Sequence, residues 1–557
     1  MPCRPKETIA MTLLDTSTPR VLSIAGTDPT GGAGIQADLK SIAASGGYGM
    51  CATTALVAQN TRGVRSIFAP PTKFLEEQLA AVFDDVTVDA VKIGMLGDVE
   101  TITTVKTWLA EHPVPVVVLD PVMVASSGDR LISQDAEQAL RELVAQADVI
   151  TPNIAELAVL CESNPAQTLK EAHNQAAQLA GSTGTIVIVK GGHLTGEDAG
   201  NSAVFPDGTH THVATTRVQT KNTHGTGCSL SSSLATRLGF ALVNGNNELS
   251  VRVLTNALAW STRWLNEAII AGEELHVGSG QGHGPVDHQA RARRLEHAAD
   301  TKPWEHLYAD KNLTGESPKN LVKPAQRKSP EPKVTPAGPW TAALWQATGD
   351  IWRDILDLPF IRGLGDGTLD EDLFGFYLDQ DAQYLAQYSR ALATLSARAT
   401  SPQGQVHWAA GAQAAIIEES LLHDEWLAAH PAIPAEQGGI RRGALSAVTM
   451  GYTNFLRATA AGEDYVVGAA AALPCYWLYL EIGYRLLEKT HEEHPYNAWI
   501  SVYGGEEFAA DVRRCVAVVE EEFEQASPSQ RVAAAQAYMS ACLYERDFFD
   551  QAHRALR

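Results

Sequence analysis

The hydrophobic and polar positions follow different rules in the two halves of the chain. In the first half, short continuous apolar runs alternate with segments whose apolar residues recur at helical spacing. The apolar runs span residues 21–25, 90–93, 114–119, 148–151 and 185–190, and the helical segments include 33–44 and 135–146. Continuous apolar runs are typical of strands that are buried on both faces. This half is therefore predicted to be an α/β domain, a mostly parallel sheet with helices on both faces.

The second half contains no comparable strand pattern. Its apolar residues recur at helical spacing over the long segments 370–393, 412–429, 444–461 and 531–556. This pattern predicts an all-α bundle. The longest apolar run, 466–480, is too short to cross a bilayer and contains Pro474, so it is predicted to be a buried helix.

A polar stretch rich in proline and lysine separates the halves. Only one of the 14 tyrosines and three of the 11 tryptophans precede residue 300, which indicates two separate cores. The polar composition predicts a semi-extended linker, because it offers little apolar surface to bury. The expected organisation is an N-terminal extension at 1–19, an α/β domain at 20–286, a linker at 287–339 and a helical domain at 340–557.

Charge and cysteine content narrow the class of protein. The formal net charge of -22 disfavours binding of nucleic acid or of an anionic membrane. The seven cysteines include no CxxC pair, which argues against a zinc site of that spacing and favours reduced thiols. The first twenty residues lack the apolar core of a signal peptide. We therefore expect a cytoplasmic protein.

Two glycine-rich turns, 26–38 and 221–229, carry the chemistry of the first half. Neither is a P-loop, but the second leads into a helix, where converging backbone N–H groups and the helix dipole suit a phosphoryl group. Cys228 lies at the start of this helix. Its thiol is expected to have a lowered pKa and to accept a proton from an attacking hydroxyl. A tight structural turn and a buried structural cysteine are the alternatives.

The helical half places reactive and aromatic side chains at helical spacing. Cys475 and Tyr479 are four residues apart, Asp381 and Tyr384 are three apart, and Glu545 lies within a late helix. They predict either a polar pocket inside the bundle or ordinary aromatic packing. Packing alone does not account for inward-pointing carboxylates, which need partners.

Seven ordered motifs in residues 20–288 resemble the hydroxymethylpyrimidine/phosphomethylpyrimidine kinase family, ThiD. They are 21–40, 54–60, 92–96, 120–123, 151–153 with Glu156, 190–193 and 221–228. The resemblance implies a ribokinase-like fold. It also implies ATP- and Mg²⁺-dependent phosphorylation of 4-amino-5-hydroxymethyl-2-methylpyrimidine and then of its monophosphate.

The same resemblance implies roles for individual residues. Asp38 and Gln59 would bind the pyrimidine edge, and Gly26 and Met95 would line its pocket. Cys228 would be catalytic. The residues expected at the ATP phosphates are Lys190, Asn153, Glu156, Gly225, Thr226 and Gly227, with Glu156 acting on Mg²⁺ indirectly.

Residues 340–557 resemble the TenA/thiaminase II family, through the strings 359–369, 379–385, 451–453, 473–481, 503–505 and 544–545. The resemblance implies a haem-oxygenase-like helical bundle. Cys475 would be the nucleophile and Glu545 the acid/base, and Asp381 would bind the aminopyrimidine edge. The tyrosines implied at the pocket are Tyr384 and Tyr452 as lining residues and Tyr479 and Tyr503 as orienting residues.

Together the two resemblances predict a bifunctional enzyme of thiamine biosynthesis and salvage. Its helical half would hydrolyse aminomethylpyrimidine or thiamine to hydroxymethylpyrimidine, the substrate of its kinase half. The alternative is a pyridoxal-type kinase fused to a non-catalytic pyrimidine-binding or regulatory module. Since relatives of both halves self-associate, a homo-oligomer is expected.

Overall fold

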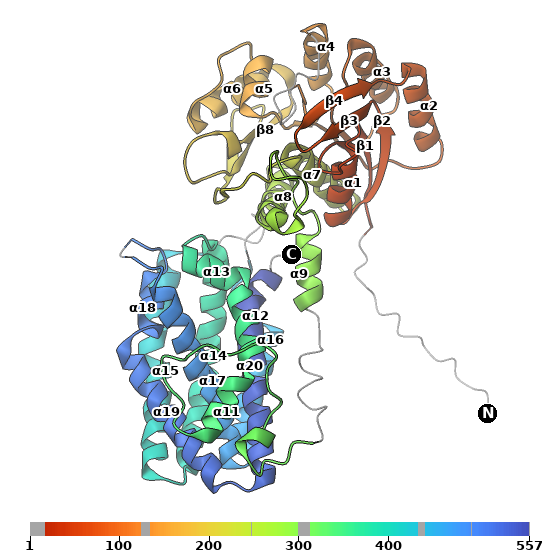
Figure 1. Cartoon of the computed structure of the whole chain (residues 1–557). Coiled ribbons are helices and arrows are strands. Elements are labelled where there is room, and N and C mark those ends of the chain that lie inside the picture. The colour runs from red at the N-terminus through yellow and green to blue at the C-terminus, as the bar shows by residue number, and fades with distance from the viewer. Residues whose placement is uncertain are drawn as a thin grey trace, which may run out of the picture. The chain divides into compact units, whose positions relative to one another are not determined.

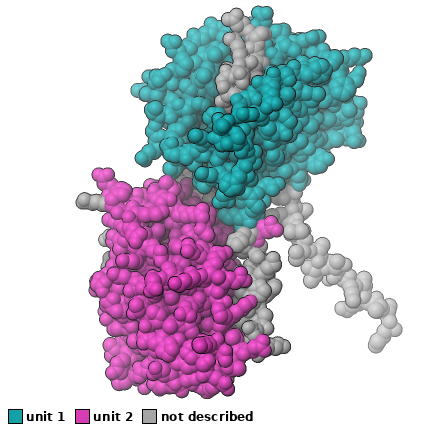
Figure 2. All heavy atoms as spheres, viewed as in Figure 1, with its two compact units in different colours: residues 1–294, 436–438 teal, residues 295–435, 439–557 magenta. Residues whose placement is uncertain are grey.

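A computed structural model describes residues 17–123, 134–246, 248–298, 312–432, 440–491 and 493–555, without the side chains of Gln134, 297–298 and 418–425. The chain forms two compact units, with the boundary after Arg294 (Figures 1 and 2). Most of the predicted N-terminal extension, residues 1–16, lies outside the described part. Each unit is described below by itself.

Unit 1 is built on an eight-stranded sheet with the order β10-β9-β8-β7-β6-β5-β1-β2. The six strands β2, β1, β5, β6, β7 and β8 pair in parallel in that order, and β9 and β10 pair antiparallel at the β8 edge. The strands are β1 (Arg20–Ala25), β2 (Tyr48–Thr53), β5 (Ala90–Ile93), β6 (Val117–Leu119), β7 (Val149–Ile150), β8 (Ile186–Lys190), β9 (Asn201–Val204) and β10 (His210–Val213). A separate hairpin pairs β3 (Leu56–Asn60) with β4 (Gly63–Phe68).

Helices cover both faces of this sheet, which confirms the predicted α/β class. One face packs on α1 (Gly34–Ala44), α7 (Thr226–Val243) and α8 (Val251–Ala271). The other packs on α2 (Thr72–Phe83), α3 (Val99–Glu111), α4 (Gln134–Val144), α5 (Ile154–Leu160) and α6 (Leu169–Thr183). Successive residues of β1 alternate between these two cores, Val21 on one and Leu22 on the other, as expected for a strand buried on both faces.

The regular secondary structure of unit 2 is all helical in its described residues. Its helices are α11 (Pro339–Ala347), α12 (Gly349–Asp357), α13 (Pro359–Asp366), α14 (Glu371–Arg398), α15 (Pro402–Ala429), α16 (Ala447–Gly462), α17 (Tyr465–Leu487), α18 (Asn497–Tyr503), α19 (Glu506–Gln525) and α20 (Pro528–Ala555). They enclose one continuous core rich in aromatic side chains. The predicted all-α bundle is confirmed.

Helix α17 is the central helix of this unit. It is long and apolar enough to cross a membrane, but 94% of its most apolar stretch is buried inside the protein. This burial is the pattern of a core helix, as the sequence predicted. Pro474 lies inside it, where it cannot donate the usual backbone hydrogen bond to the preceding turn.

The prediction that residues 287–339 form an extended linker is wrong for the described part of that segment. Residues Ala290–Ala298 form helix α9, and the stretch that precedes α11 packs on unit 2. Leu321 and Val334 are buried in the core of the bundle, and the Trp477 indole donates to the Val334 carbonyl at 3.1 Å. The average composition is polar, but two apolar residues at the right places are enough to anchor a short segment.

Candidate active sites

The two glycine-rich turns of unit 1 are held together by Asp28. Its carboxylate accepts hydrogen bonds from the backbone N–H groups of Thr30, Gly32 and Ala33, and its Oδ2 lies 2.8 Å from Nε2 of His224. Burial alone would raise the pKa of Asp28, but the hydrogen bonds from His224 and Thr30 lower it to about 2. A charged carboxylate therefore joins the first turn to the second.

The second turn packs directly against the first at Gly225. This residue has φ +81°, and a Cβ there would lie 1.7 Å from the carbonyl oxygen of Gly32. Only glycine adopts this positive φ readily and also lets the two backbones approach so closely. Gly225 is also the N-cap of α7, so the contact fixes where the free N–H groups of that helix begin.

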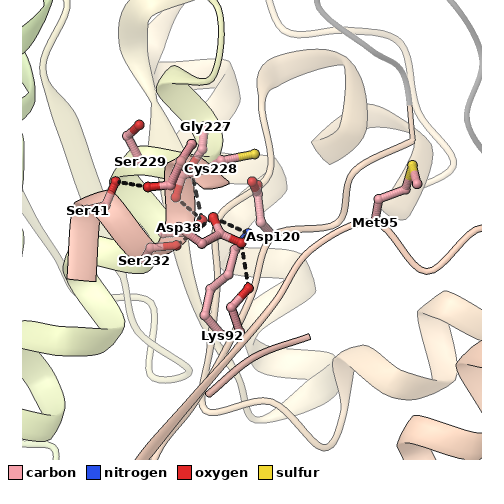
Figure 3. A network of polar contacts seen from close by, with 12 residues as sticks. Asp38, Ser41, Lys92, Met95, Asp120, Gly227, Cys228, Ser229 and Ser232 are labelled. Carbon is pink, nitrogen blue, oxygen red and sulfur yellow. Dashed lines mark hydrogen bonds and ion pairs between the residues drawn. The ribbon is translucent and has the colours of Figure 1, made fainter. Parts of the chain in front are cut away.

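The first turn of α7 faces charged residues at the carboxyl ends of two strands. Asp120 follows β6, and Lys190 is the last residue of β8; their side chains form an ion pair of 3.2 Å. A Cβ at Gly227 would lie 3.4 Å from both Asp120 Oδ2 and Lys190 Nζ. Figure 3 shows Asp120, Gly227 and Cys228 in this neighbourhood. Helix N–H groups and a lysine meeting at one point suit a phosphoryl group.

The Cys228 thiol does not have the lowered pKa that its place in the helix predicts. Burial, together with the charges of Asp38 and Asp120, outweighs Lys92 and raises the pKa of Cys228 to about 11. The partial charge of a helix N-terminus is too small to offset this desolvation. Cys228 is only half-buried, and the side chains whose charges act on it are Lys92, Asp38 and Asp120.

Asp38 forms a buried ion pair with Lys92. The Lys92 ammonium lies 2.9 and 2.8 Å from the two carboxylate oxygens, and Ser23 and Ser232 each donate to one of them, at 2.6 and 2.8 Å (Figure 3). Asp38 and Lys92 are both 0% exposed. Three groups thus make four hydrogen bonds to this carboxylate. Its binding of the pyrimidine edge stays a prediction.

Asn153 and Glu156 form a reciprocal capping box at the start of α5. Asn153 Oδ1 accepts from the N–H of Glu156, and Glu156 Oε2 accepts from the N–H of Asn153. Burial raises the pKa of Glu156 to about 7; Lys190 opposes this shift and Asp120 adds to it. Glu156 thus lies in the same electrostatic cluster as Lys190, although the described residues contain no group of three metal-ligating side chains.

Three of the residues predicted at the pyrimidine pocket can be placed as follows. Gly26 and Met95 are neighbours, since a Cβ at Gly26 would meet Cε of Met95 at 2.5 Å. Gln59 lies on β3 and lines a cleft of about 360 Å³ beside the hairpin turn.

Lys92, Asp120 and Asp28 belong to the site but had no predicted role. Lys92 had a detectable signal, because it interrupts the apolar run 90–93 and a lysine in a buried strand needs a partner. Asp120 directly follows another buried strand, at the edge where ligands bind in such sheets. The role of Asp28 depends on a contact with His224, 196 residues away, which no local pattern indicates.

The predicted pocket residues of unit 2 lie on five helices that face one core. Asp381 and Tyr384 are on α14, Tyr452 on α16, Cys475 and Tyr479 on α17, Tyr503 on α18 and Glu545 on α20. Between residues 465 and 483 of α17, every residue is buried except Cys475. Cys475 is therefore partly accessible, unlike its neighbours along the helix.

Glu545 is a strongly perturbed carboxyl group of this unit. It is 1% exposed, and burial raises its pKa to about 8, although a hydrogen bond of 2.5 Å from the Tyr452 hydroxyl opposes the shift. The carboxyl group is therefore largely protonated at neutral pH. A protonated acid in a buried site can donate a proton to a leaving group.

Tyrosines surround these two groups. Burial raises the pKa values of Tyr384, Tyr452 and Tyr479, and the charges of Cys475 and Glu545 add to the shift of each. The rings of Tyr384 and Tyr452 have centroids 5.1 Å apart, and those of Tyr479 and Tyr503 5.2 Å. Tyr384, Tyr452 and Tyr479 therefore remain neutral hydroxyl groups.

Asp381 and the unpredicted Tyr377 belong to the same cluster. Asp381 is 2% exposed, and its charge contributes to the raised pKa values of Tyr377 and Tyr479. The hydroxyls of these two tyrosines are 3.1 Å apart. Tyr377 had a detectable signal, because it lies four residues before Asp381 on the same helical face.

Comparison with known proteins matches each unit to a family. The family described as phosphomethylpyrimidine kinase matches residues 28–287, and the TENA/THI-4/PQQC family matches residues 345–555. The thiamine biosynthesis multifunctional protein ThiED of Corynebacterium glutamicum is 55% identical over 538 residues, which cover 97% of this chain and 68% of that protein.

Two further relatives match the first unit. The hydroxymethylpyrimidine/phosphomethylpyrimidine kinase of Escherichia coli is 42% identical over 268 residues, 48% of this chain and 96% of that protein. A crystal structure of phosphomethylpyrimidine kinase from Clostridium difficile is 33% identical, covers 45% of this chain and 100% of that chain, and has a TM-score of 0.39.

Proposed function

Since the chain belongs to the family of the ThiED multifunctional thiamine biosynthesis proteins, we propose that it carries two activities on one pyrimidine. Unit 1 transfers the γ-phosphoryl group of ATP to 4-amino-5-hydroxymethyl-2-methylpyrimidine and then to the resulting monophosphate. Unit 2 hydrolyses aminomethylpyrimidine or thiamine and releases hydroxymethylpyrimidine. The product of the second unit is then a substrate of the first.

The observation that carries the kinase proposal is the meeting of the α7 N-terminus with Lys190 and Asp120. Backbone N–H groups of the turn around Gly225 and Gly227 would bind an incoming phosphoryl group, and Lys190, which lies close to Gly227, would add a positive charge beside it. Such an arrangement stabilises charge that spreads over the transferred group in the transition state.

Cys228 takes a modified role in this proposal. With a pKa of about 11 its thiol is protonated at neutral pH, so it does not act as a general base. We assign it to the acceptor hydroxyl, which it positions by hydrogen bonding at the start of α7. A loose transition state requires little removal of the hydroxyl proton before the new bond to phosphorus forms.

The carboxylates near Lys190 fit a magnesium ion that accompanies ATP. Glu156 and Asp120 repel each other in a buried cluster, which contributes to the raised pKa of Glu156, and a divalent cation relieves such repulsion. The ion would be held through its water shell by Glu156 and Asp120, as is usual for Mg²⁺. When bound, it neutralises charge on the nucleotide phosphates.

For unit 2 the proposal depends on Cys475 and Glu545 lying in one buried polar cluster. Cys475 adds as a thiolate to the electron-poor pyrimidine ring, which makes the exocyclic methylene carbon a site of elimination. After the amine has left, water adds to this carbon, and breaking of the carbon–sulfur bond releases the thiolate and hydroxymethylpyrimidine. Glu545, protonated at neutral pH, donates its proton to the departing amine. Asp381 binds the aminopyrimidine edge, Tyr384 and Tyr452 line the pocket, and Tyr479 and Tyr503 orient the reacting groups.

A single experiment tests both activities. The full chain is incubated with aminomethylpyrimidine, ATP and Mg²⁺, and the products are identified by mass spectrometry. Pyrimidine diphosphate is the expected product. With Cys475→Ser, no diphosphate should form from aminomethylpyrimidine, whereas hydroxymethylpyrimidine should still be phosphorylated. Loss of both activities in this variant would contradict independent sites.

The alternative functions give different results in the same assays. A preference for pyridoxal over hydroxymethylpyrimidine by orders of magnitude would replace the substrate of unit 1. If the wild-type chain binds aminomethylpyrimidine tightly but never releases amine, and Glu545→Gln weakens that binding, unit 2 is a binding module. A cytoplasmic location and a homo-oligomeric state stay predictions.

A further inference from the structure

A cleft of about 360 Å³ in unit 1 is lined by residues 59–63, by Lys221 and His224, and by residues 281–283. These three segments are far apart in the sequence. The first is the turn of the β3–β4 hairpin, and the second immediately precedes the N-terminus of α7. The cleft thus adjoins the predicted phosphate-binding turn.

Backbone hydrogen bonds hold the walls of this cleft in place. The N–H of His283 donates to the Thr61 carbonyl at 3.0 Å, and the N–H of His224 donates to the Gly284 carbonyl at 3.0 Å. A Cβ at Gly282 would lie 2.0 Å from the Thr61 oxygen, so the loop approaches the hairpin as closely as glycine allows. The cleft is a built feature of the fold.

The charge of the lining is opposite to that of the chain. The chain has 65 acidic and 43 basic residues, yet the lining contains Arg62, Lys221, His224 and His283 and no aspartate or glutamate. Among the described residues, neither Arg62 nor Lys221 forms an ion pair. Asp28 contacts His224, but its side chain is fully buried and accepts hydrogen bonds from the first glycine-rich turn, so it does not line the cleft. Such a lining attracts an anion.

We propose that this cleft binds the phosphate of the phosphomonoester substrate and so favours the second phosphorylation over the first. The inference rests on the proposed kinase function. Gln59, which the family resemblance assigns to the pyrimidine, lines the same cleft as Arg62 and Lys221. A pyrimidine held by Gln59 places its phosphate among these cations, next to the turn that receives the transferred group. The hydroxymethyl substrate of the first step is neutral and gains nothing from them.

The test compares the two substrates in the full chain. Arg62→Met and Lys221→Met are expected to lower the ratio of kcat/KM for the pyrimidine monophosphate to kcat/KM for hydroxymethylpyrimidine by about tenfold each. Arg65→Met removes the same charge from an exposed position of β4 outside the cleft, and Lys170→Met does so on α6. Both control variants should keep the wild-type ratio.

The salt dependence of KM and the KM for ATP show which part of the proposal fails, if one does. In the wild-type protein, KM for the monophosphate should rise with salt more steeply than KM for hydroxymethylpyrimidine. An unchanged ratio in both cleft variants overturns the proposal, and so does a rise in KM for ATP alone, which would assign the cleft to the nucleotide. If the wild-type protein phosphorylates neither pyrimidine, the proposed kinase function itself fails.

Discussion

The hydroxyl of Tyr452 donates a hydrogen bond of 2.5 Å to Oε1 of Glu545, and both residues are buried in the core of unit 2. The bond joins α16 to α20 across the bundle. It stabilises the carboxylate form of Glu545, yet burial is the larger effect and raises the pKa to about 8. The pair therefore sets the protonation state of the proposed acid.

Glu545→Gln removes the transferable proton while keeping the shape of the side chain and a polar partner for Tyr452. Amine release from aminomethylpyrimidine should fall by about 100-fold or more, which is the usual contribution of a positioned acid. Kinase activity on hydroxymethylpyrimidine provides the internal control. Amine release at the wild-type rate would show that another group donates the proton.

The same variant should change how stability depends on pH. The pKa of Glu545 is about 8 in the folded chain and 4.5 in the reference state, so between these values the folded state holds an extra proton. The free energy of unfolding that Glu545 contributes is complete below pH 4.5 and is lost as the pH rises through 8. Melting temperatures measured from pH 5 to 8.5 should therefore fall less steeply in Glu545→Gln than in the wild type. Parallel curves would refute the raised pKa.

Tyr452→Phe removes the hydrogen bond that opposes the shift of Glu545. The pKa of Glu545 should rise further, and the alkaline limit of amine release should move to higher pH. Loss of the bond should also cost about 1–3 kcal/mol of stability. Tyr465→Phe is a matched control, because its hydroxyl accepts a 2.7 Å bond from the Trp408 indole. That variant should lose stability without any shift in the pH profile.

Cys228 should react slowly with alkylating reagents at neutral pH. With a pKa of about 11, the thiolate makes up roughly one molecule in three thousand at pH 7.5. The rate of iodoacetamide labelling, followed by peptide mass spectrometry, should rise about tenfold per pH unit between pH 7 and 10. A rate that is already constant at pH 7 would restore the lowered pKa predicted from the helix N-terminus.

Lys92→Met should destabilise unit 1 by about 3–5 kcal/mol, because it leaves Asp38 charged and buried without its partner. The double variant Lys92→Met with Asp38→Asn should recover much of this loss, since a neutral amide can accept from one of the two serines and donate to the hydroxyl oxygen of the other. Urea unfolding of both variants measures the difference. Equal losses in the single and double variants would contradict a buried charge as the cause.

Local pattern alone predicted the main elements of both units. Residues 90–93 and 186–190 form strands where continuous apolar runs predicted them, and the helical spacing of 370–393 matches α14. The edge strands β9 and β10 were not predicted. In β10 the residues are partly exposed, with two histidines and a threonine, so no apolar run marks it.

The sequence by itself determined which residue types were available for chemistry and roughly where: glycines before α7, a thiol and carboxylates at helical spacing in unit 2. Only the tertiary structure decided their state. Burial against Asp38 and Asp120 gave Cys228 a raised pKa, and the contact with Lys92 made Asp38 an ion-pair partner. A pKa depends on solvent and charge in three dimensions, and the charges that matter here come from segments that are distant along the chain.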